Sequence, residues 1–244
     1  MMARLRGLFL AAFWFTGIAL IAPPLILLLL ITKNEHVLFK PVRLFVKLGL
    51  FLVGVKVKVS GLEHLDPDQP YIFTPNHQSF IEVPLFVTYL DRYPGYLAKK
   101  EVFKYPIFGY GIRLAKVVPV DRSNSPSAVE SAKAATANIR QGKSYMVYPE
   151  GTRSKDGRLL PFKKGAFMMA IDAGVPVVPV TVSGATKIMP KGSFNIFPST
   201  VHLTIHEPMS TAGYSKENVA ELMERARQKI YSALSPEEAG LSSP

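Results

Sequence analysis

The 244-residue chain contains no cysteine, and it has few acidic residues in its first quarter. Without cysteine the chain forms no disulfide, has no thiol nucleophile and offers no thiolate to a metal, which fits a reducing cytosolic compartment. The G-x-S-x-G motif of α/β-hydrolases is also absent. Charged residues make up 19% of the chain and hydrophobic residues 48%, and this balance excludes a disordered protein.

The charge is unevenly distributed along the chain. The formal net charge is +11, and residues 1–60 hold 8 basic residues against 1 acidic residue. Residues 121–180 hold 9 against 5, whereas residues 61–120 and 181–244 each hold 6 of both signs. A nucleic-acid-binding domain carries basic stripes through its folded part, so we expect no nucleic-acid partner. The most basic block is also the most apolar, which indicates an anionic membrane surface.

Residues 1–54 are predicted to form a helical membrane anchor. Between Arg6 and Lys33 lie 26 uncharged residues. As one helix this run would reach about 39 Å, enough to cross a hydrocarbon core of about 30 Å. Pro23 and Pro24 predict a kink or a break in it. The run fits either one kinked transmembrane helix or a re-entrant, monotopic element.

Basic residues flank the apolar run on both sides, which predicts that the domain after it lies on the cytoplasmic face of the membrane. In the following stretch, residues 36–54, Lys40, Arg43 and Lys47 form one basic stripe on an otherwise apolar segment. This pattern is typical of a helix lying in the headgroup plane. A core helix with a solvated charged stripe is the alternative, but the adjacent apolar run favours the membrane.

After Gly54 strands alternate with helices. Apolar and β-branched runs predict strands at 55–59, 71–74, 95–99, 115–120, 144–148, 175–183 and 201–206. Helices are expected at 79–90, 125–141, 164–173 and 215–234. The spacing predicts an α/β domain over residues 55–234, with a largely parallel mixed sheet flanked by helices. Residues 235–244 are expected to be a flexible tail.

The first candidate site lies just after the strand at 71–74, where His77 precedes Glu82 by five residues. Ligands of α/β proteins bind at such strand ends, and a histidine oriented by a carboxylate is a candidate general base. The two side chains can meet only if His77 precedes the helix, because positions i and i+5 lie about 140° apart on a helix. Ser79 to Glu82 is also an S-x-x-E capping box, in which the carboxylate reaches back to the Ser79 amide. Spacing alone leaves both roles open.

The second candidate site runs from Tyr148 to Ser154, with the sequence Y-P-E-G-T-R-S, again just after a strand. Gly151 lets the backbone approach a ligand. Arg153 can hold a phosphate through two charge-assisted hydrogen bonds, and Glu150 can accept one from a hydroxyl. A solvated turn before a helix is the simpler reading of the same residues. Between these sites, the basic and aromatic segment 99–122 suits an anionic lipid headgroup beside an apolar groove.

Taken in order, these segments resemble the glycerophospholipid acyltransferase family, in particular the bacterial 1-acyl-sn-glycerol-3-phosphate acyltransferases. The resemblance covers roughly residues 55–210. The family's N-H-x4-D motif corresponds to Asn76, His77 and position 82, where this chain has Glu in place of Asp. Three further motifs match, at Lys100, Phe103, Gly109 and Arg122, at Tyr148 to Ser154, and at the proline-punctuated strand Val175 to Val180.

The resemblance implies acyl transfer without an acyl-enzyme. His77 would deprotonate the sn-2 hydroxyl of a lysophosphatidic acid drawn from the membrane, and Glu82 would hold the imidazole. The donor would be acyl-CoA or acyl-acyl carrier protein, with no cofactor and no metal. The acceptor's phosphate would be bound by Arg153, Arg122 and Lys100, and its glycerol by Glu150, within the Glu150-Gly151-Thr152-Arg153 segment.

Three other functions remain open at this point. An esterase or lipase would hydrolyse lipid without an acyl thioester. A non-catalytic lipid-binding protein on the same fold is favoured only by Glu82, and the intact segment 150–153 speaks against it. Within the acyltransferases, the acceptor could be another lysophospholipid.

Overall fold

The computed structural model of the protein describes residues 1–34, 36–90, 92–114, 116–121 and 125–241. Within these residues seven strands form one sheet in the order β1-β7-β6-β2-β5-β3-β4. Neighbouring strands run parallel, except that β6 and β7 are antiparallel. The strands are β1 (Lys56–Ser60), β2 (Ile72–Pro75), β3 (Gly95–Lys99), β4 (Val118–Val120), β5 (Tyr145–Met146), β6 (Val177–Ser183) and β7 (Thr200–Ile205).

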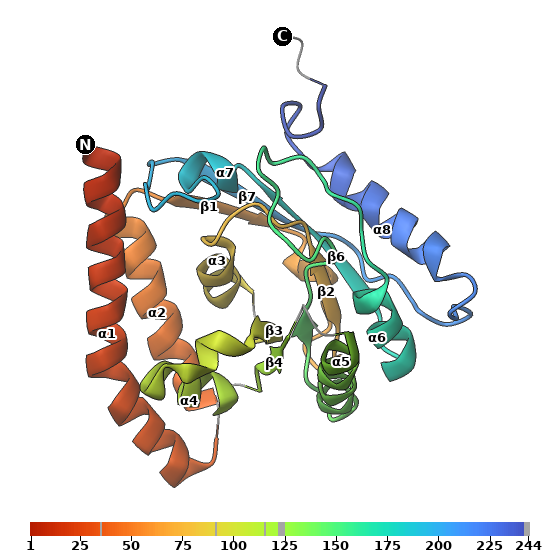
Figure 1. The fold of residues 1–244 in the computed structure, drawn as a ribbon, viewed down its shortest axis with the longest axis horizontal. Helices are drawn as coiled ribbons and strands as arrows, with labels where there is room; N and C mark the ends of the chain where they lie inside the picture. The colour runs from red at the N-terminus through yellow and green to blue at the C-terminus, as the bar shows by residue number, and fades with distance from the viewer. Residues whose placement is uncertain (35, 91, 115, 122–124, 242–244) are drawn as a thin grey trace.

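Helices cover both faces of this sheet (Figure 1). The α-helices are α1 (Met2–Thr32), α2 (His36–Leu52), α3 (Glu82–Tyr89), α4 (Pro106–Leu114), α5 (Ser125–Arg140), α6 (Gly165–Ala173), α7 (Ala185–Ile188) and α8 (Val219–Ser232). Short 3-10 turns occur at η1 (Leu62–His64) and η2 (Lys100–Lys104). The predicted fold class, an α/β layered domain with a largely parallel mixed sheet behind an N-terminal helical segment, is confirmed.

Adjacent residues of one strand supply two separate hydrophobic cores. Phe73 of β2 packs with α2, α3 and α7 on one face, whereas Ile72 packs with α5, α6 and α8 on the other. This alternation follows from the two-residue period of a strand. Because both faces are covered, all seven residues of β6 are buried, which explains its nearly continuous run of apolar residues.

The two N-terminal helices form an antiparallel pair along one flank of the molecule (Figure 1). A Cβ at Gly17 of α1 would lie 1.9 Å from the Phe45 ring of α2, so only glycine allows this close approach. Helix α1 continues through Pro23 and Pro24, so the predicted break is absent, and its ribbon bends in its lower part. Within the described residues α1 is the one helix long and apolar enough to cross a membrane.

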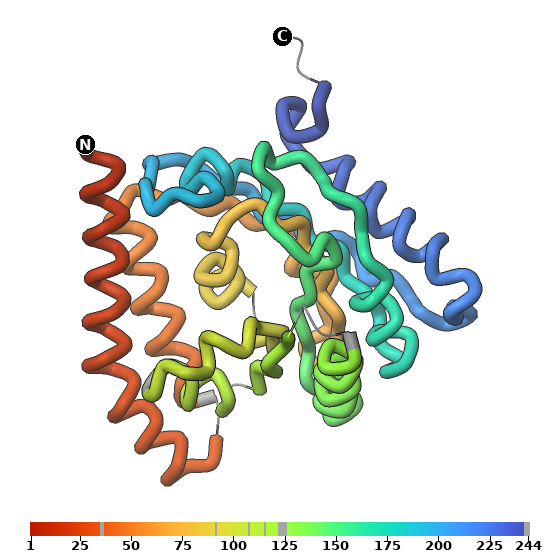
Figure 2. Tube along the Cα trace, viewed as in Figure 1, coloured from red at the N-terminus to blue at the C-terminus, as the bar shows by residue number. Residues whose placement is uncertain are grey.

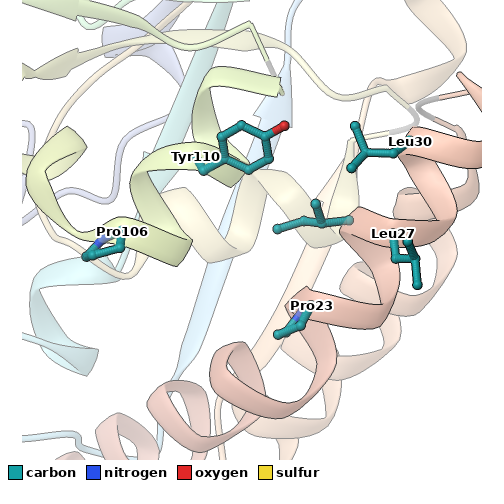
Figure 3. A pocket seen from close by; sticks show the side chains of 6 residues that line it. Pro23, Leu27, Leu30, Pro106 and Tyr110 are labelled. Atoms are coloured by element: carbon teal, nitrogen blue, oxygen red, sulfur yellow. The ribbon is translucent and has the colours of Figure 1, made fainter.

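An open apolar groove of about 410 Å³ separates the C-terminal part of α1 from α4 (Figure 3). Pro23, Leu27 and Leu30 line one side, and Pro106 and Tyr110 line the other. At the opposite end of α1, the amide of Ile196 donates to the carbonyl of Ala3 (2.9 Å). Helix α1 therefore contacts the globular part near both of its ends.

The C-terminal segment differs from the flexible tail that the sequence predicted. Residues 235–241 form a turn that returns beside the segment following β5 (Figure 2). Glu238 is only 3% exposed, and its carboxylate accepts hydrogen bonds from the side chains of Ser183 and Gln78. The prediction of a flexible tail is therefore wrong for residues 235–241, because buried Glu238 joins them to the end of β6. Residues 242–244 of the predicted tail lie outside the described residues.

Candidate active site

The carboxyl ends of the parallel strands meet at one edge of the sheet, and the site is built there. Asn76 extends the edge of β2 with its side chain: its Nδ2 donates to the carbonyl of Val182 (2.8 Å), and its Oδ1 accepts from the amide of Val182 (2.7 Å). The amide group thereby imitates a backbone ladder pair between β2 and β6. This contact fixes where the chain leaves the sheet and where His77 begins.

The His77 ring is held by the carboxylate of Glu82. Its Nδ1 lies 2.7 Å from Glu82 Oε2, and Glu82 is fully buried. The other oxygen, Oε1, accepts from the amides of Gln78 (2.5 Å) and Ser79 (2.6 Å). The two competing roles predicted for Glu82 are therefore both present, one on each oxygen. Helix α3 begins at Glu82 rather than at Ser79, because residues 79–81 form the turn that the carboxylate closes.

The backbone of His77 is held from both sides as well. Its amide donates to Glu150 Oε1 (2.8 Å), and its carbonyl accepts from the amide of Ser154 (2.7 Å). The Tyr148 ring stacks on the imidazole with centroids 3.8 Å apart. Because Nδ1–H donates to a carboxylate, the lone pair of the neutral ring lies on Nε2, so Nε2 is the atom that can accept a proton.

Glu150 supports His77 rather than reaching toward a ligand. It is 3% exposed, and its second oxygen accepts from the amide of Leu160 (3.0 Å). The sequence predicted a contact with the substrate's glycerol, whereas both oxygens are used on backbone amides. Burial raises the pKa of the Glu150 carboxyl to about 7, and the two amide donors partly offset that rise because they stabilise the carboxylate.

The turn after Glu150 includes Arg153, whose guanidinium is the positively charged group beside His77's loop. Gly151 has φ 70°, a conformation that favours glycine. Thr152 is exposed. The Arg153 guanidinium lies over the Phe80 ring, 3.7 Å from its centroid, and the Arg153 carbonyl accepts from the ammonium of Lys191. Phe80 is 57% exposed, so this stacked guanidinium stands at the surface beside His77's loop.

Lys100, the second predicted phosphate ligand, does not join this cluster. Lys100 follows β3, two strands from β2, which is a separation of roughly 10 Å. Its ammonium lies 2.5 Å from the Asp121 carboxylate at the end of β4, and this contact raises the pKa of Lys100. Arg122 lies outside the described residues. Of the two predicted cations that the structure describes, Arg153 lies beside His77's loop and Lys100 does not.

The arrangement is a histidine held by a buried carboxylate, with a guanidinium nearby. Among the described residues, no group of three or more His, Asp or Glu side chains could hold a metal ion. Sequence reasoning missed the roles of Asn76, Tyr148 and Phe80, although Asn76 and Tyr148 stand inside the motifs. For Asn76 and Tyr148, the position at the end of a predicted strand or just after it was the signal in the sequence that could have indicated these roles.

The fold and this site define an α/β acyltransferase. The family model described as Acyltransferase matches residues 56–183, and the chain belongs to that family. The solved structure of the 1-acyl-sn-glycerophosphate (LPA) acyltransferase PlsC from Thermotoga maritima is similar, with a TM-score of 0.78 and 28% sequence identity over 96% of this chain and 100% of that one.

Curated relatives are similar in sequence. The chloroplastic 1-acyl-sn-glycerol-3-phosphate acyltransferase BAT2 of Brassica napus is 40% identical over 72% of this chain and 50% of its own length. The chloroplastic 1-acyl-sn-glycerol-3-phosphate acyltransferase LPAT1 of Arabidopsis thaliana is 36% identical over 93% of this chain and 64% of its own length. The chain thus matches between half and two thirds of the length of these relatives.

Proposed function

We propose that the protein transfers a fatty acyl chain from an acyl thioester, acyl-CoA or acyl-acyl carrier protein, to the sn-2 hydroxyl of 1-acyl-sn-glycerol-3-phosphate. The product is phosphatidic acid. The observation that carries the proposal is the His77–Glu82 pair, with Nδ1 and Oε2 2.7 Å apart at the end of β2, inside the segment that matches the family. The names of the similar proteins support the acceptor.

With its proton on Nδ1, the His77 ring has Nε2 as its basic atom, and the proposed reaction steps start there. Nε2 of His77 removes the proton of the acceptor hydroxyl as its oxygen attacks the thioester carbonyl. The resulting imidazolium is stabilised by the Glu82 carboxylate, as in other His–carboxylate pairs. When the tetrahedral oxyanion collapses, the C–S bond breaks, and the thiolate takes the proton from Nε2. An ester and a free thiol result, and His77 returns to its starting state.

The acceptor's phosphate would bind to Arg153. A guanidinium offers two parallel N–H donors to phosphate oxygens. Stacking on Phe80 holds the Arg153 guanidinium in one orientation, which reduces the side-chain entropy that is lost when phosphate binds. Lys100 and Arg122 remain proposed contributors, and the pairing of Lys100 with Asp121 means that phosphate would have to compete with a carboxylate there.

The membrane role is assigned to the α1–α2 pair. Helix α1 contacts the globular part at Ala3 and again near Leu30, positions that are about 40 Å apart along a helix. A crossing α1 would therefore draw that whole flank into the hydrocarbon. This supports a monotopic anchor that lies in one leaflet. Basic residues on both sides of the apolar run support a catalytic domain on the cytoplasmic face. Lysophosphatidic acid would be drawn from the same leaflet.

The apolar surface also includes the end of the molecule where α1 begins and α2 ends. Phe51 at the end of α2 is 75% exposed, and Phe194, in the loop that contacts the start of α1, is 73% exposed. Arg4 and Arg6 lie on the adjoining first turns of α1. Aromatic rings beside arginines are typical of a headgroup region, and this supports contact between that end of the molecule and an anionic bilayer.

The test is an acyl-transfer assay with the purified full chain in mixed micelles. It uses a series of acyl-CoA and acyl-acyl carrier protein donors with several lysolipid acceptors, and it measures free thiol and esterified product. We expect thiol release that requires lysophosphatidic acid and is lost in His77→Ala. Thiol release with another lysolipid, and none with lysophosphatidic acid, would show that the other lysolipid is the acceptor. No release with any acceptor would refute the enzyme, and release without an acceptor would indicate hydrolysis.

A further inference from the structure

The C-terminal turn places a buried carboxylate among the loops of the site. Glu238 Oε1 accepts from the amide of Gly184 and from Gln78 Nε2, each at 2.9 Å. Its Oε2 accepts from the hydroxyls of Ser183 (2.5 Å) and Ser235 (2.9 Å). The carboxylate is 3% exposed and receives hydrogen bonds from neutral donors of three chain segments. Such a charge is stable in a buried place only when its hydrogen bonds are complete.

Gln78 connects this carboxylate to His77. Its Nε2 also donates to the carbonyl of Gly157 (3.1 Å), in the turn that follows Arg153. Its other amide atom, Oε1, is buried without a hydrogen-bond partner among the described residues, so the side chain is oriented through Nε2 alone. The backbone amide of Gln78 is one of the two donors that hold Glu82.

We propose that Glu238 is a positioning residue, which fixes the loop of His77 through Gln78 and joins it to the 154–157 turn and to the end of β6. The inference rests on the proposed function and adds to it a residue outside the matched segment. Removing the carboxylate leaves Gln78 with one acceptor and releases the contact between the C-terminal turn and Ser183. The His77 loop then loses its outer support, while its direct contacts to Glu82 and Glu150 remain.

A simpler role would be to anchor the C-terminus and contribute only to stability. The two roles differ in what a folded variant does. A stabilising contact lowers the melting temperature but leaves the turnover of each folded molecule unchanged. A positioning contact lowers kcat in molecules that are fully folded, because small displacements of a reacting group reduce the rate about 10- to 100-fold. It changes KM for the lysolipid less than kcat, since the contacts of Arg153 with Phe80 and Lys191 do not involve Glu238.

The variants are Glu238→Ala and Glu238→Gln, with Glu237→Gln as the matched control. Glu237 is the preceding residue, 64% exposed and paired with Lys187 at the surface. Glutamine keeps one acceptor oxygen for Gln78 and Gly184, so it should restore part of the activity. Each variant is assayed well below its melting temperature. In parallel, hydrogen exchange is followed by mass spectrometry for residues 76–79 and 154–158, with α5 as the internal reference.

We expect Glu238→Ala to lower kcat about 10-fold or more, with Glu238→Gln between it and the wild type and Glu237→Gln unchanged. Amides in 76–79 and 154–158 should exchange faster, and those of α5 should not. A normal kcat with normal exchange in these segments would overturn the proposal. If Glu238→Ala does not fold, Gln78→Met tests the same link and must show the same kcat loss. Exchange needs no turnover, so an inactive wild type would refute the enzyme while the exchange result still decides the role of Glu238.

Discussion

Replacing Glu82 with glutamine changes one atom at the centre of the site. The carboxylate is fully buried, with Oε1 2.5 and 2.6 Å from two backbone amides and Oε2 2.7 Å from His77 Nδ1. Glutamine can keep its oxygen toward the amides, because that position requires an acceptor. Its NH₂ group must then face His77, where the wild-type protein has an acceptor.

The consequence is a change of tautomer. An NH₂ donor requires Nδ1 to be the acceptor, which moves the ring proton to Nε2 and removes the lone pair that should take the substrate's proton. The imidazolium formed during transfer also loses its carboxylate. A positioned general base is worth about 10²- to 10⁴-fold in rate, so the barrier should rise by about 3 to 5 kcal/mol. The two amide contacts survive, so the fold should be retained.

The assay is release of coenzyme A followed with a thiol reagent such as dithionitrobenzoate. Because the chain contains no cysteine, the reagent reports only on product. Glu63→Gln, at an exposed glutamate of η1, is the matched control and should keep full activity. Glu82→Asp, one methylene shorter, should retain more activity than Glu82→Gln because it keeps an acceptor. An unchanged kcat in Glu82→Gln, with activity lost in His77→Ala, would refute the reasoning.

Three further predictions concern other parts of the molecule. The pKa of Glu150 rises from 4.5 to about 7 on folding, so the stability tied to its proton is complete below pH 4.5 and is lost as pH rises to 7. Glu150→Gln should remove up to about 3 kcal/mol of that pH dependence in urea unfolding at pH 5 and pH 8. Arg153→Lys should raise KM for lysophosphatidic acid about 10-fold in steady-state kinetics while changing kcat less, since lysine loses both the two-pronged contact and the stacking on Phe80. A fluorophore on Phe194→Cys should shift to the blue with anionic vesicles, whereas the same label on Val129→Cys of α5, which is 54% exposed, should not.

The seven strands and the helices α3, α5, α6 and α8 could be predicted in order, because each of these elements has a local signal. The helices α4 and α7 were not predicted. The all-buried β6 is apolar almost throughout, because both of its faces are covered. The antiparallel direction of β7 depends on the connection instead. Helix α7 has only four residues, and the rest of residues 184–199 extends to the start of α1. Parallel neighbouring strands need a crossover connection, usually a helix, and no helix of ordinary length lies in this stretch. The short connection could therefore have indicated an antiparallel pair.

The sequence could predict which residues form the site, but not which hydrogen bonds they make. Spacing could pair His77 with Glu82 but could not decide between capping and orienting, because the answer depends on which oxygen faces which donor. The partners of Glu150 are backbone amides of residues 73 and 10 positions away in the chain. A sequence does not show which backbone amides a carboxylate will accept from, because almost every residue has one. The expected contact between Glu150 and glycerol could therefore not be excluded from the sequence.

The same reasoning explains why net charge described the surface of this protein better than its site. Glu82, Glu150 and Glu238 are each no more than 3% exposed, and each binds backbone amides at the carboxyl edge of the sheet. Their carboxyl oxygens hold loops in place and are hydrogen-bonded inside the protein. Arg153 is stacked at the surface, with its guanidinium over Phe80. An anionic headgroup would thus meet the cation from outside, while the acids that would repel it stay buried behind the loops.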